Sequence, residues 1–170
     1  SAAVTPAGRP TTPGTPTAVR GDSSATVTWA ASSPNGSVVT GYTVTSNPSS
    51  LTCTTTTALT CTVTGLTNGT SYTFSVVATN AVGNSTASAD SNAVTPAKAP
   101  DIPTGVTAVR DNASASVSWT APANNGEAIT NYRVTSSPGG FICNSATSPQ
   151  GARLSNWLNS PNQSVKNGAL

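Results

Sequence analysis

Residues 70–80 read TSYTFSVVATN, and this stretch decides the fold. Tyr72, Phe74, Val76 and Ala78 occupy every second position, and most of the residues between them are Ser or Thr. Alternation with a period of two places one face of an extended strand in an apolar core and turns the other toward solvent. The stretch therefore predicts a β-strand with one buried face.

The same alternation recurs on both sides of this stretch. Ala25, Val27 and Trp29 follow it, as do Tyr42 and Val44. Turn-forming residues separate these segments; they are Pro34-Asn35-Gly36, Asn47-Pro48, Asn68-Gly69 and Gly83-Asn84. About seven short strands at this spacing favour an all-β, two-sheet sandwich.

The composition argues against two classes of partner. Charged residues make up 7% of the 170 residues, and the net charge is +2. That balance lacks the basic surface of a nucleic-acid-binding protein. No apolar run approaches the ~20 residues that a membrane-spanning helix needs. We therefore expect no nucleic-acid partner and no membrane insertion.

An internal repeat divides the chain. Residues 17–29, TAVRGDSSATVTW, align without gaps with residues 107–119, TAVRDNASASVSW, 90 positions later. The same offset relates residues 3–7 to residues 93–97, which are identical. Repetition of this kind indicates a tandem array of one module. We interpret the chain as a piece of a longer array.

The module resembles a fibronectin type III domain of the bacterial secreted type. The resemblance covers residues 13–96 completely and residues 103 to about 148 in part. It implies an immunoglobulin-like β-sandwich, with Leu66 and Tyr72 as the family's tyrosine corner. The positions that carry it are Pro16, Trp29, Tyr42, Val44, Leu66, Tyr72, Phe74, Val76, Ala78, Asn80 and Gly83. The expected structural core is Trp29, Tyr42, Leu66, Tyr72, Phe74, Trp119 and Tyr132.

Five segments follow from the repeat. The expected fold is one complete module plus a truncated second module. Pro-rich linkers, which favour stiff and extended chain, precede each module. The expected segments are 1–12, the end of a preceding repeat with its linker; 13–96, the complete domain; 97–102, a linker; 103–150, a partial domain; and 151–170, a divergent tail.

The second module departs from the pattern near residue 148. The segment GARLSNWLNSPNQSVKNGAL contains no counterpart of the Tyr-x-Phe-x-Val strand. We expect its last three strands to be missing or unrecognisable, with a short helix at residues 152–160 as one candidate structure. Half a sandwich leaves one sheet uncovered. Residues 103–170 are therefore predicted to be unstable alone.

The three cysteines have different expected fates. Cys53 and Cys61 are placed to face each other in a hairpin of adjacent strands, and a disulfide there would contribute about 2–3 kcal/mol. The alternative is two buried free thiols. Cys143 matches Cys53, but Gly151 stands at the position that matches Cys61. Cys143 is thus either a free thiol or available for an intermolecular bridge.

The tripeptide Arg20-Gly21-Asp22 admits two interpretations. It is an integrin-ligand sequence, which requires exposure on a protruding loop. The second repeat has Asp111-Asn112 at the positions of Gly21-Asp22, which indicates a polar turn between two strands. We favour the turn.

The residues give no indication of catalysis. The chain has no His, and its five carboxylates form no convincing acid–base pair. No Ser or Thr has a recognisable activating base. Three cysteines without His argue against a zinc site. We expect no catalytic, cofactor-binding or metal-ligating residues.

The sequence bears on three candidate functions. The first is a non-catalytic extracellular spacer or stalk, linking domains of a secreted or surface protein such as a polysaccharide-degrading enzyme; its partners are the neighbouring domains of the same polypeptide. The second is a cell-surface adhesin or matrix module that binds a protein or polysaccharide. Such a module needs an exposed aromatic or charged cluster, and nearly every aromatic residue falls at a core position. The third, a catalytic domain, conflicts with the missing site chemistry.

Overall fold

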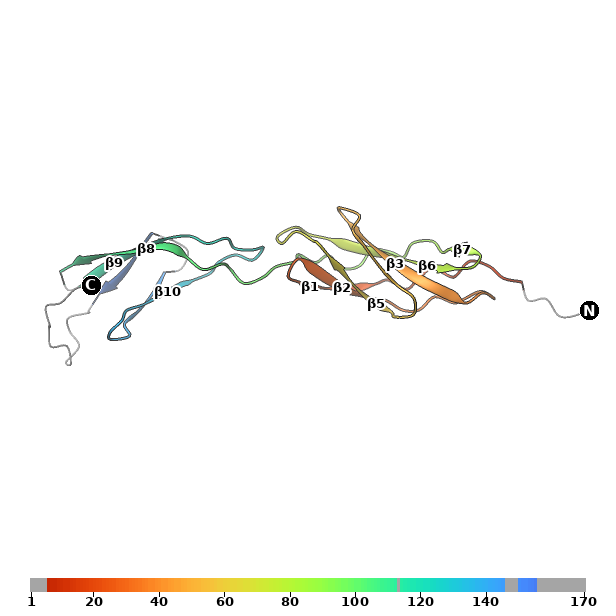
Figure 1. Cartoon of the computed structure of the whole chain (residues 1–170), viewed down its shortest axis with the longest axis horizontal. Coiled ribbons are helices and arrows are strands. Elements are labelled where there is room, and N and C mark those ends of the chain that lie inside the picture. Colours follow the sequence, from red (N-terminus) through yellow and green to blue (C-terminus); the bar gives the residue numbers. More distant parts are fainter. Residues whose placement is uncertain (1–5, 113, 146–149, 156–170) are drawn as a thin grey trace, which may run out of the picture. The chain divides into compact units, whose positions relative to one another are not determined.

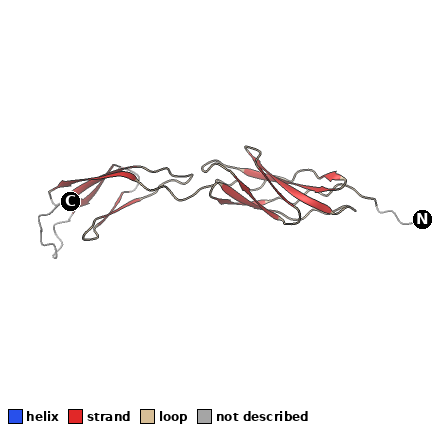
Figure 2. Cartoon of the chain, in the orientation of Figure 1, coloured by secondary structure: helices blue, strands red, loops and turns tan. Residues whose placement is uncertain are grey.

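The protein is built from β-strands. The computed structural model describes residues 6–112, 114–145 and 150–155, and helices are absent from these ranges (Figure 2). The chain divides into two compact units. The first comprises Ser1–Ala99 with Asn125–Glu127, and the second comprises Pro100–Asn124 and Ala128–Leu170. The expected all-β class is confirmed.

The first sheet of the first unit is made of three antiparallel strands in the order β1-β2-β5. These are β1 (Thr17–Gly21), β2 (Ser24–Thr28) and β5 (Thr60–Thr64) (Figure 1). In β2 and β5, side chains that face the core alternate with exposed threonines, so the threonines form most of the outer face of these two strands. The hydroxyls of Thr17 and Thr28, which are opposite each other in β1 and β2, lie 2.8 Å apart. β-Branched residues on a half-buried pleated surface favour this arrangement.

The second sheet has the order β4-β3-β6-β7. Its central strands, β3 (Val39–Asn47) and β6 (Thr73–Asn80), pair antiparallel over their whole length. The short strands β4 (Thr52–Thr55) and β7 (Gly83–Asn84) pair on the outer sides of β3 and β6.

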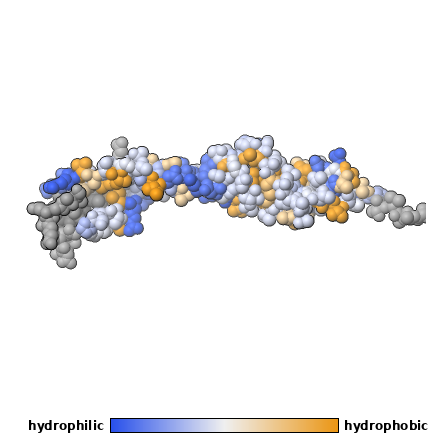
Figure 3. Space-filling model, in the orientation of Figure 1, coloured by the Kyte–Doolittle hydropathy of each residue, from blue (hydrophilic) through white to orange (hydrophobic). Residues whose placement is uncertain are grey.

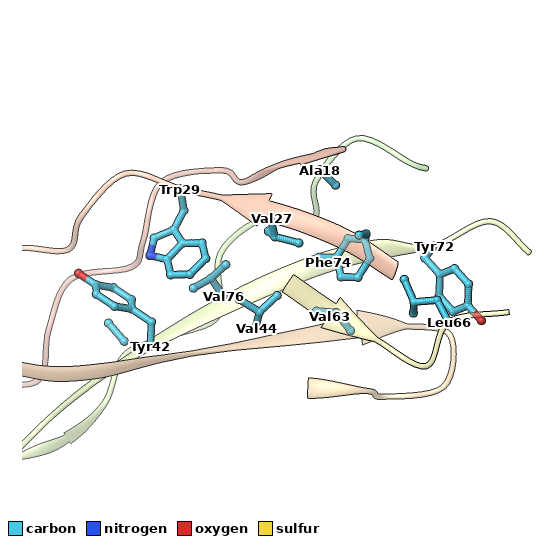
Figure 4. Packing of buried hydrophobic residues seen from close by; sticks show 12 residues of the cluster. Ala18, Val27, Trp29, Tyr42, Val44, Val63, Leu66, Tyr72, Phe74 and Val76 are labelled. Carbon is cyan, nitrogen blue, oxygen red and sulfur yellow. The ribbon is translucent and has the colours of Figure 1, made fainter. Parts of the chain in front are cut away.

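The core lies between the two sheets (Figure 4). Val27 from β2, Val63 from β5, and Val44 from β3 point toward Phe74 and its neighbours on β6. The buried cluster consists of Ala18, Ala25, Val27, Trp29, Tyr42, Val44, Val63, Leu66, Tyr72, Phe74, Val76 and Ala78.

The second unit repeats part of this plan. Its first sheet has the order β12-β9-β8, formed by β8 (Thr104–Asp111), β9 (Ser114–Thr120) and β12 (Gln150–Ser155). Its second sheet holds only β10 (Tyr132–Thr135) and β11 (Ile142–Ser145) among the described residues. The ring centroids of Trp119 and Tyr132 lie 5.0 Å apart, and those of Trp29 and Tyr42 lie 5.5 Å apart.

Strand β12 corrects two expectations about the tail. Residues 152–155 belong to a strand rather than a helix, and one of the three strands expected to be missing is present. A bulge between Gln150 and Ala152 shifts the register, so Ala152 pairs with Val117 as Cys61 pairs with Val27. The counterpart of Cys61 is therefore Ala152, not Gly151. Residues 1–5 and 156–170, which include the expected end of a preceding repeat and most of the tail, lie outside the described ranges.

Candidate functional site

The Arg20-Gly21-Asp22 tripeptide lies at the end of β1 and in the turn to β2. Arg20 and Gly21 are the last residues of β1, and Ser24 begins β2. The Asp22 carboxylate accepts a hydrogen bond from the Asn68 amide at 2.8 Å. The same Asn68 side chain accepts from the Ser23 backbone N–H at 2.9 Å. The aspartate therefore stabilises a tight turn, which favours the turn interpretation.

A disulfide joins Cys53 and Cys61, whose Cα atoms lie 6.2 Å apart. Cys53 lies on β4 and Cys61 on β5. Because β4 pairs with β3 and β5 pairs with β2, the two cysteines belong to edge strands of different sheets. The expectation of a hairpin of adjacent strands is wrong, since the bridge links the two layers of the sandwich. Cys143 is half-buried and forms no disulfide in the structure.

The expected core residues lie at different depths in the two units. The five expected core residues of the first unit all belong to its buried cluster; they are Trp29, Tyr42, Leu66, Tyr72 and Phe74. Trp119 is also buried, but Tyr132 is only half-buried.

The Tyr72 hydroxyl closes the corner before β6. It accepts a hydrogen bond from the backbone N–H of Thr67 at 3.1 Å. This bond holds the pKa of the Tyr72 phenol below its ordinary value, because the donated hydrogen stabilises the phenolate. The neighbouring Leu66 is buried in the core.

A ladder of three serines covers the free edge of β6, and the sequence patterns did not predict it. We call Ser85, Ser88 and Ser91 the serine ladder. Their backbone N–H groups donate to the carbonyls of Ala78, Val76 and Phe74 at 2.8, 2.9 and 2.9 Å. Their hydroxyls accept from the N–H groups of the same three residues at 3.0, 2.9 and 3.1 Å.

The serine ladder therefore satisfies both the donors and the acceptors of the β6 edge without a regular strand. Asn92 continues this closure onto the first sheet. Its side chain accepts from the Ala18 N–H at 2.9 Å and donates to the Ala18 carbonyl at 3.0 Å. An open sheet edge is a template for pairing with another chain, and these side chains remove that template.

Replacing Ser88 by alanine should lower the free energy of unfolding of the first unit by about 1–3 kcal/mol, because the buried Val76 N–H loses its acceptor. Ser88 is 8% exposed. Urea denaturation measures the loss. Ser71→Ala, the same change at an exposed serine, is the matched control and should have little effect. Equal effects of both variants would contradict the role of the ladder.

The second unit contains an open apolar cleft of about 440 Å³. Val117 and Trp119 from β9 line it, together with Tyr132 and Val134 from β10. In the first unit, the counterparts of these four residues pack against Phe74 and Val76 (Figure 4). The cleft is thus the part of a sandwich core that a strand equivalent to β6 would fill.

Side chains that could bind a metal do not cluster in the part of the chain that the structure describes. Its His, Cys, Asp and Glu residues form no cluster of three that could hold a metal ion. Asp90 is paired with the Thr73 hydroxyl at 3.3 Å and Asp22 with Asn68, so these two carboxylates have structural partners. The same ranges hold no helix long and apolar enough to cross a membrane.

Comparison with known proteins gives a family and one curated relative. The fibronectin type III domain family matches residues 11–94. Chitinase A1 of Niallia circulans is 41% identical over 121 residues, which are 65% of this chain and 16% of that protein. The chain therefore spans only a small part of the relative that it matches.

Two solved structures are among those that match this chain. The chicken CNTN1 FN1–FN3 domains are 19% identical, with a TM-score of 0.49 over 86% of this chain and 55% of that one. The titin kinase with its flanking domains is 17% identical, with a TM-score of 0.46 over 66% of this chain and 27% of that one.

Proposed function

Because the chain belongs to the fibronectin type III family through residues 11–94, we propose that it is a non-catalytic, extracellular spacer from a tandem array. The array links domains of a secreted or surface protein such as a polysaccharide-degrading enzyme. Its partners are the neighbouring domains of the same polypeptide.

The observation that carries this proposal is the closure of the first unit. Its core is filled by its own side chains, and the serine ladder and Asn92 satisfy the edges of β6 and β1. A unit with filled core and satisfied edges stays folded and inert while it holds other domains apart. The disulfide between its sheets suits an oxidising, extracellular compartment.

The connection to the second unit supports a spacing role. The Ala97 N–H donates to the Gly21 carbonyl within the first unit, and the Asp101 N–H donates to the Ala123 carbonyl within the second. Only residues 98–100 lie between these anchors, and residue 100 is a proline. A short connection of this composition restricts the excursions of the chain. The match to 16% of a chitinase agrees with an accessory segment of a larger enzyme.

Binding assays test the proposal against the adhesin alternative. The purified chain is incubated with insoluble chitin and cellulose, and separately coated on plates for an integrin-dependent cell-adhesion assay. We expect no more binding than for an inert protein of similar size, and no loss with Asp22→Glu. Saturable binding to either polysaccharide, or adhesion that Asp22→Glu abolishes, would overturn the spacer function in favour of an adhesin.

A further inference from the structure

Two segments of the first unit that are far apart in the sequence run side by side. The first segment, residues 8–21, ends with β1, and the last segment, residues 85–97, contains the serine ladder. Three contacts join them in the same order along both segments, and we call these contacts the parallel seam. They are the Thr12 hydroxyl with the Thr86 hydroxyl, Ala18 with the Asn92 side chain, and the Gly21 carbonyl with the Ala97 N–H. Because the order is the same, the two segments are parallel.

Asn92 lies at the centre of the parallel seam. Its side-chain amide accepts from the Ala18 N–H at 2.9 Å and donates to the Ala18 carbonyl at 3.0 Å, so it pairs with Ala18 as a peptide group of a neighbouring strand would. Further along, the Ala97 N–H donates to the Gly21 carbonyl at 3.1 Å. The outer edge of β1 is therefore bonded to the last segment at both of its ends.

The last segment is also bonded to the second sheet. Val94 and Tyr72 exchange two backbone hydrogen bonds of 2.9 Å, and the Pro96 carbonyl accepts from the Gly69 N–H at 2.9 Å. The serine ladder continues this pairing along β6. The last segment thus contacts β1 of one sheet and β6 of the other, and it cannot turn away from β1 while its bonds to the second sheet remain.

Tension on the ends of the unit acts along the parallel seam. The chain enters the unit beside β7, where a Cβ on Gly83 would lie 3.2 Å from the Arg9 Nε, and it leaves at the end of β1, beside Gly21 (Figure 1). Pulling on both ends draws the first segment toward its N-terminus and the last segment toward its C-terminus. In parallel segments these directions are opposite, so the three contacts are strained together. In antiparallel segments the contacts would break one after another.

Sliding of the two segments would also expose apolar surface. Ala18 is 6% exposed, Pro96 is buried, and Val94 packs against the buried cluster. Figure 3 shows the visible surface of the first unit mostly in the pale shades of residues with intermediate hydropathy. Contact of the buried apolar side chains with water is unfavourable, so it adds to the resistance of the hydrogen bonds.

We propose that the parallel seam keeps the first unit folded under tension applied to its two ends. This inference rests on the proposed spacer function, because a segment that links domains transmits any force between them. Unfolding under force is governed by the unfolding rate rather than by the equilibrium stability. Asn92, which makes two of the strained hydrogen bonds, therefore sets how long the unit stays folded under a given force.

Single-molecule force spectroscopy of the whole chain, held by its two ends at constant force, tests the proposal. The Cys53–Cys61 disulfide identifies the first unit, because reduction should lengthen its unfolding step by about 3.3–3.6 Å for each residue between the two cysteines. Asn92→Ala should raise the unfolding rate of this step about tenfold or more, because two hydrogen bonds of the seam are lost.

Ser88→Ala is the matched control, because it also removes a side-chain hydrogen bond to a backbone N–H of the unit. The contacts of Ser88 with β6 stay intact while the seam breaks, and interactions that are intact in the transition state have little effect on the unfolding rate. Ser88→Ala should therefore unfold under force at the wild-type rate, although both variants unfold at a lower urea concentration. A purely stabilising role of Asn92 would not separate the two variants.

Two results would overturn the proposal. The first is a wild-type unfolding rate under force for Asn92→Ala. The second is an equal increase of the rate in Asn92→Ala and Ser88→Ala, because resistance to force would then follow the general stability of the unit. Saturable binding to chitin or cellulose would contradict the spacer function without changing either rate, so the two proposals fail separately.

Discussion

Replacing Phe74 by alanine is expected to lower the free energy of unfolding of the first unit by about 3–5 kcal/mol. Phe74 is 0% exposed and lies at the centre of the buried cluster between the two sheets. The change removes most of an aromatic side chain, and the surrounding strands are held by hydrogen bonds and cannot close the cavity. Small domains are stable by about 5–15 kcal/mol, so this loss is a large fraction of the total.

Urea denaturation followed by the fluorescence of Trp29 measures this loss, in a background where Trp119 and Trp157 are replaced by phenylalanine. The matched control is Val19→Ala on β1, because Val19 is 68% exposed. We expect the control to change stability by less than about 0.5 kcal/mol. A loss below about 1 kcal/mol for Phe74→Ala would show that the core relaxes around the missing ring.

Phe74 is also the kind of residue that the sequence can identify. Its burial follows from alternation within one segment, and the repeat supports the strand assignments because the β1–turn–β2 segment occurs twice in the sequence. Such patterns lie within one segment of sequence, so they can be recognised without knowing which strands pair with each other. The prediction of an all-β sandwich rests on them.

The features that the sequence did not reveal depend on distant partners. The serine ladder has a period of three, because Ser85, Ser88 and Ser91 meet every second residue of β6. A period of three does not match the period of two that indicates a strand. A serine-rich segment without that alternation is therefore predicted to be a loop.

Strand β12 was hidden by a different physical cause. The bulge between Gln150 and Ala152 adds one residue, so Leu154 rather than Arg153 pairs with Ala115 at the position where Val63 pairs with Ala25. An alignment at a fixed offset of 90 cannot find that match. The bridge between Cys53 and Cys61 was placed in a hairpin for a related reason, since closeness in sequence does not show which sheet each strand joins. The instability expected for residues 103–170 stays a prediction.

Replacing Asn80 by alanine should lower the free energy of unfolding by about 2–4 kcal/mol, because several backbone groups in partly buried hydrogen bonds lose their partner together. Asn80 is 4% exposed. Its side-chain N–H₂ donates to the carbonyls of Gly8, Pro34 and Ser37 at 2.8, 3.2 and 3.1 Å. Its side-chain oxygen accepts from the N–H groups of Val82 and Gly83 at 2.9 and 3.2 Å.

The position of Asn80 explains why one polar residue has so large an effect. It ends β6 on the inward face, where the alternation that begins at Tyr72 would place another apolar side chain. An apolar residue there would contribute burial but would leave three carbonyls and two N–H groups without this partner. Asn80 thus links Gly8, the loop before β3 and the turn before β7 through the hydrogen bonds of one side chain.

Hydrogen exchange of individual amides distinguishes the loss of these local contacts from a general loss of stability. In Asn80→Ala, the amides of Gly8 and Thr11, which donate to Asn35 and Ser33, should exchange faster than the global loss alone requires. The matched control is Asn84→Ala, because Asn84 is exposed and its side-chain oxygen accepts only from the Thr79 hydroxyl among the described contacts. If both variants lose equal stability, or if the amides of residues 8–14 follow the rest of the unit, the contacts of Asn80 do not hold that segment to the sandwich.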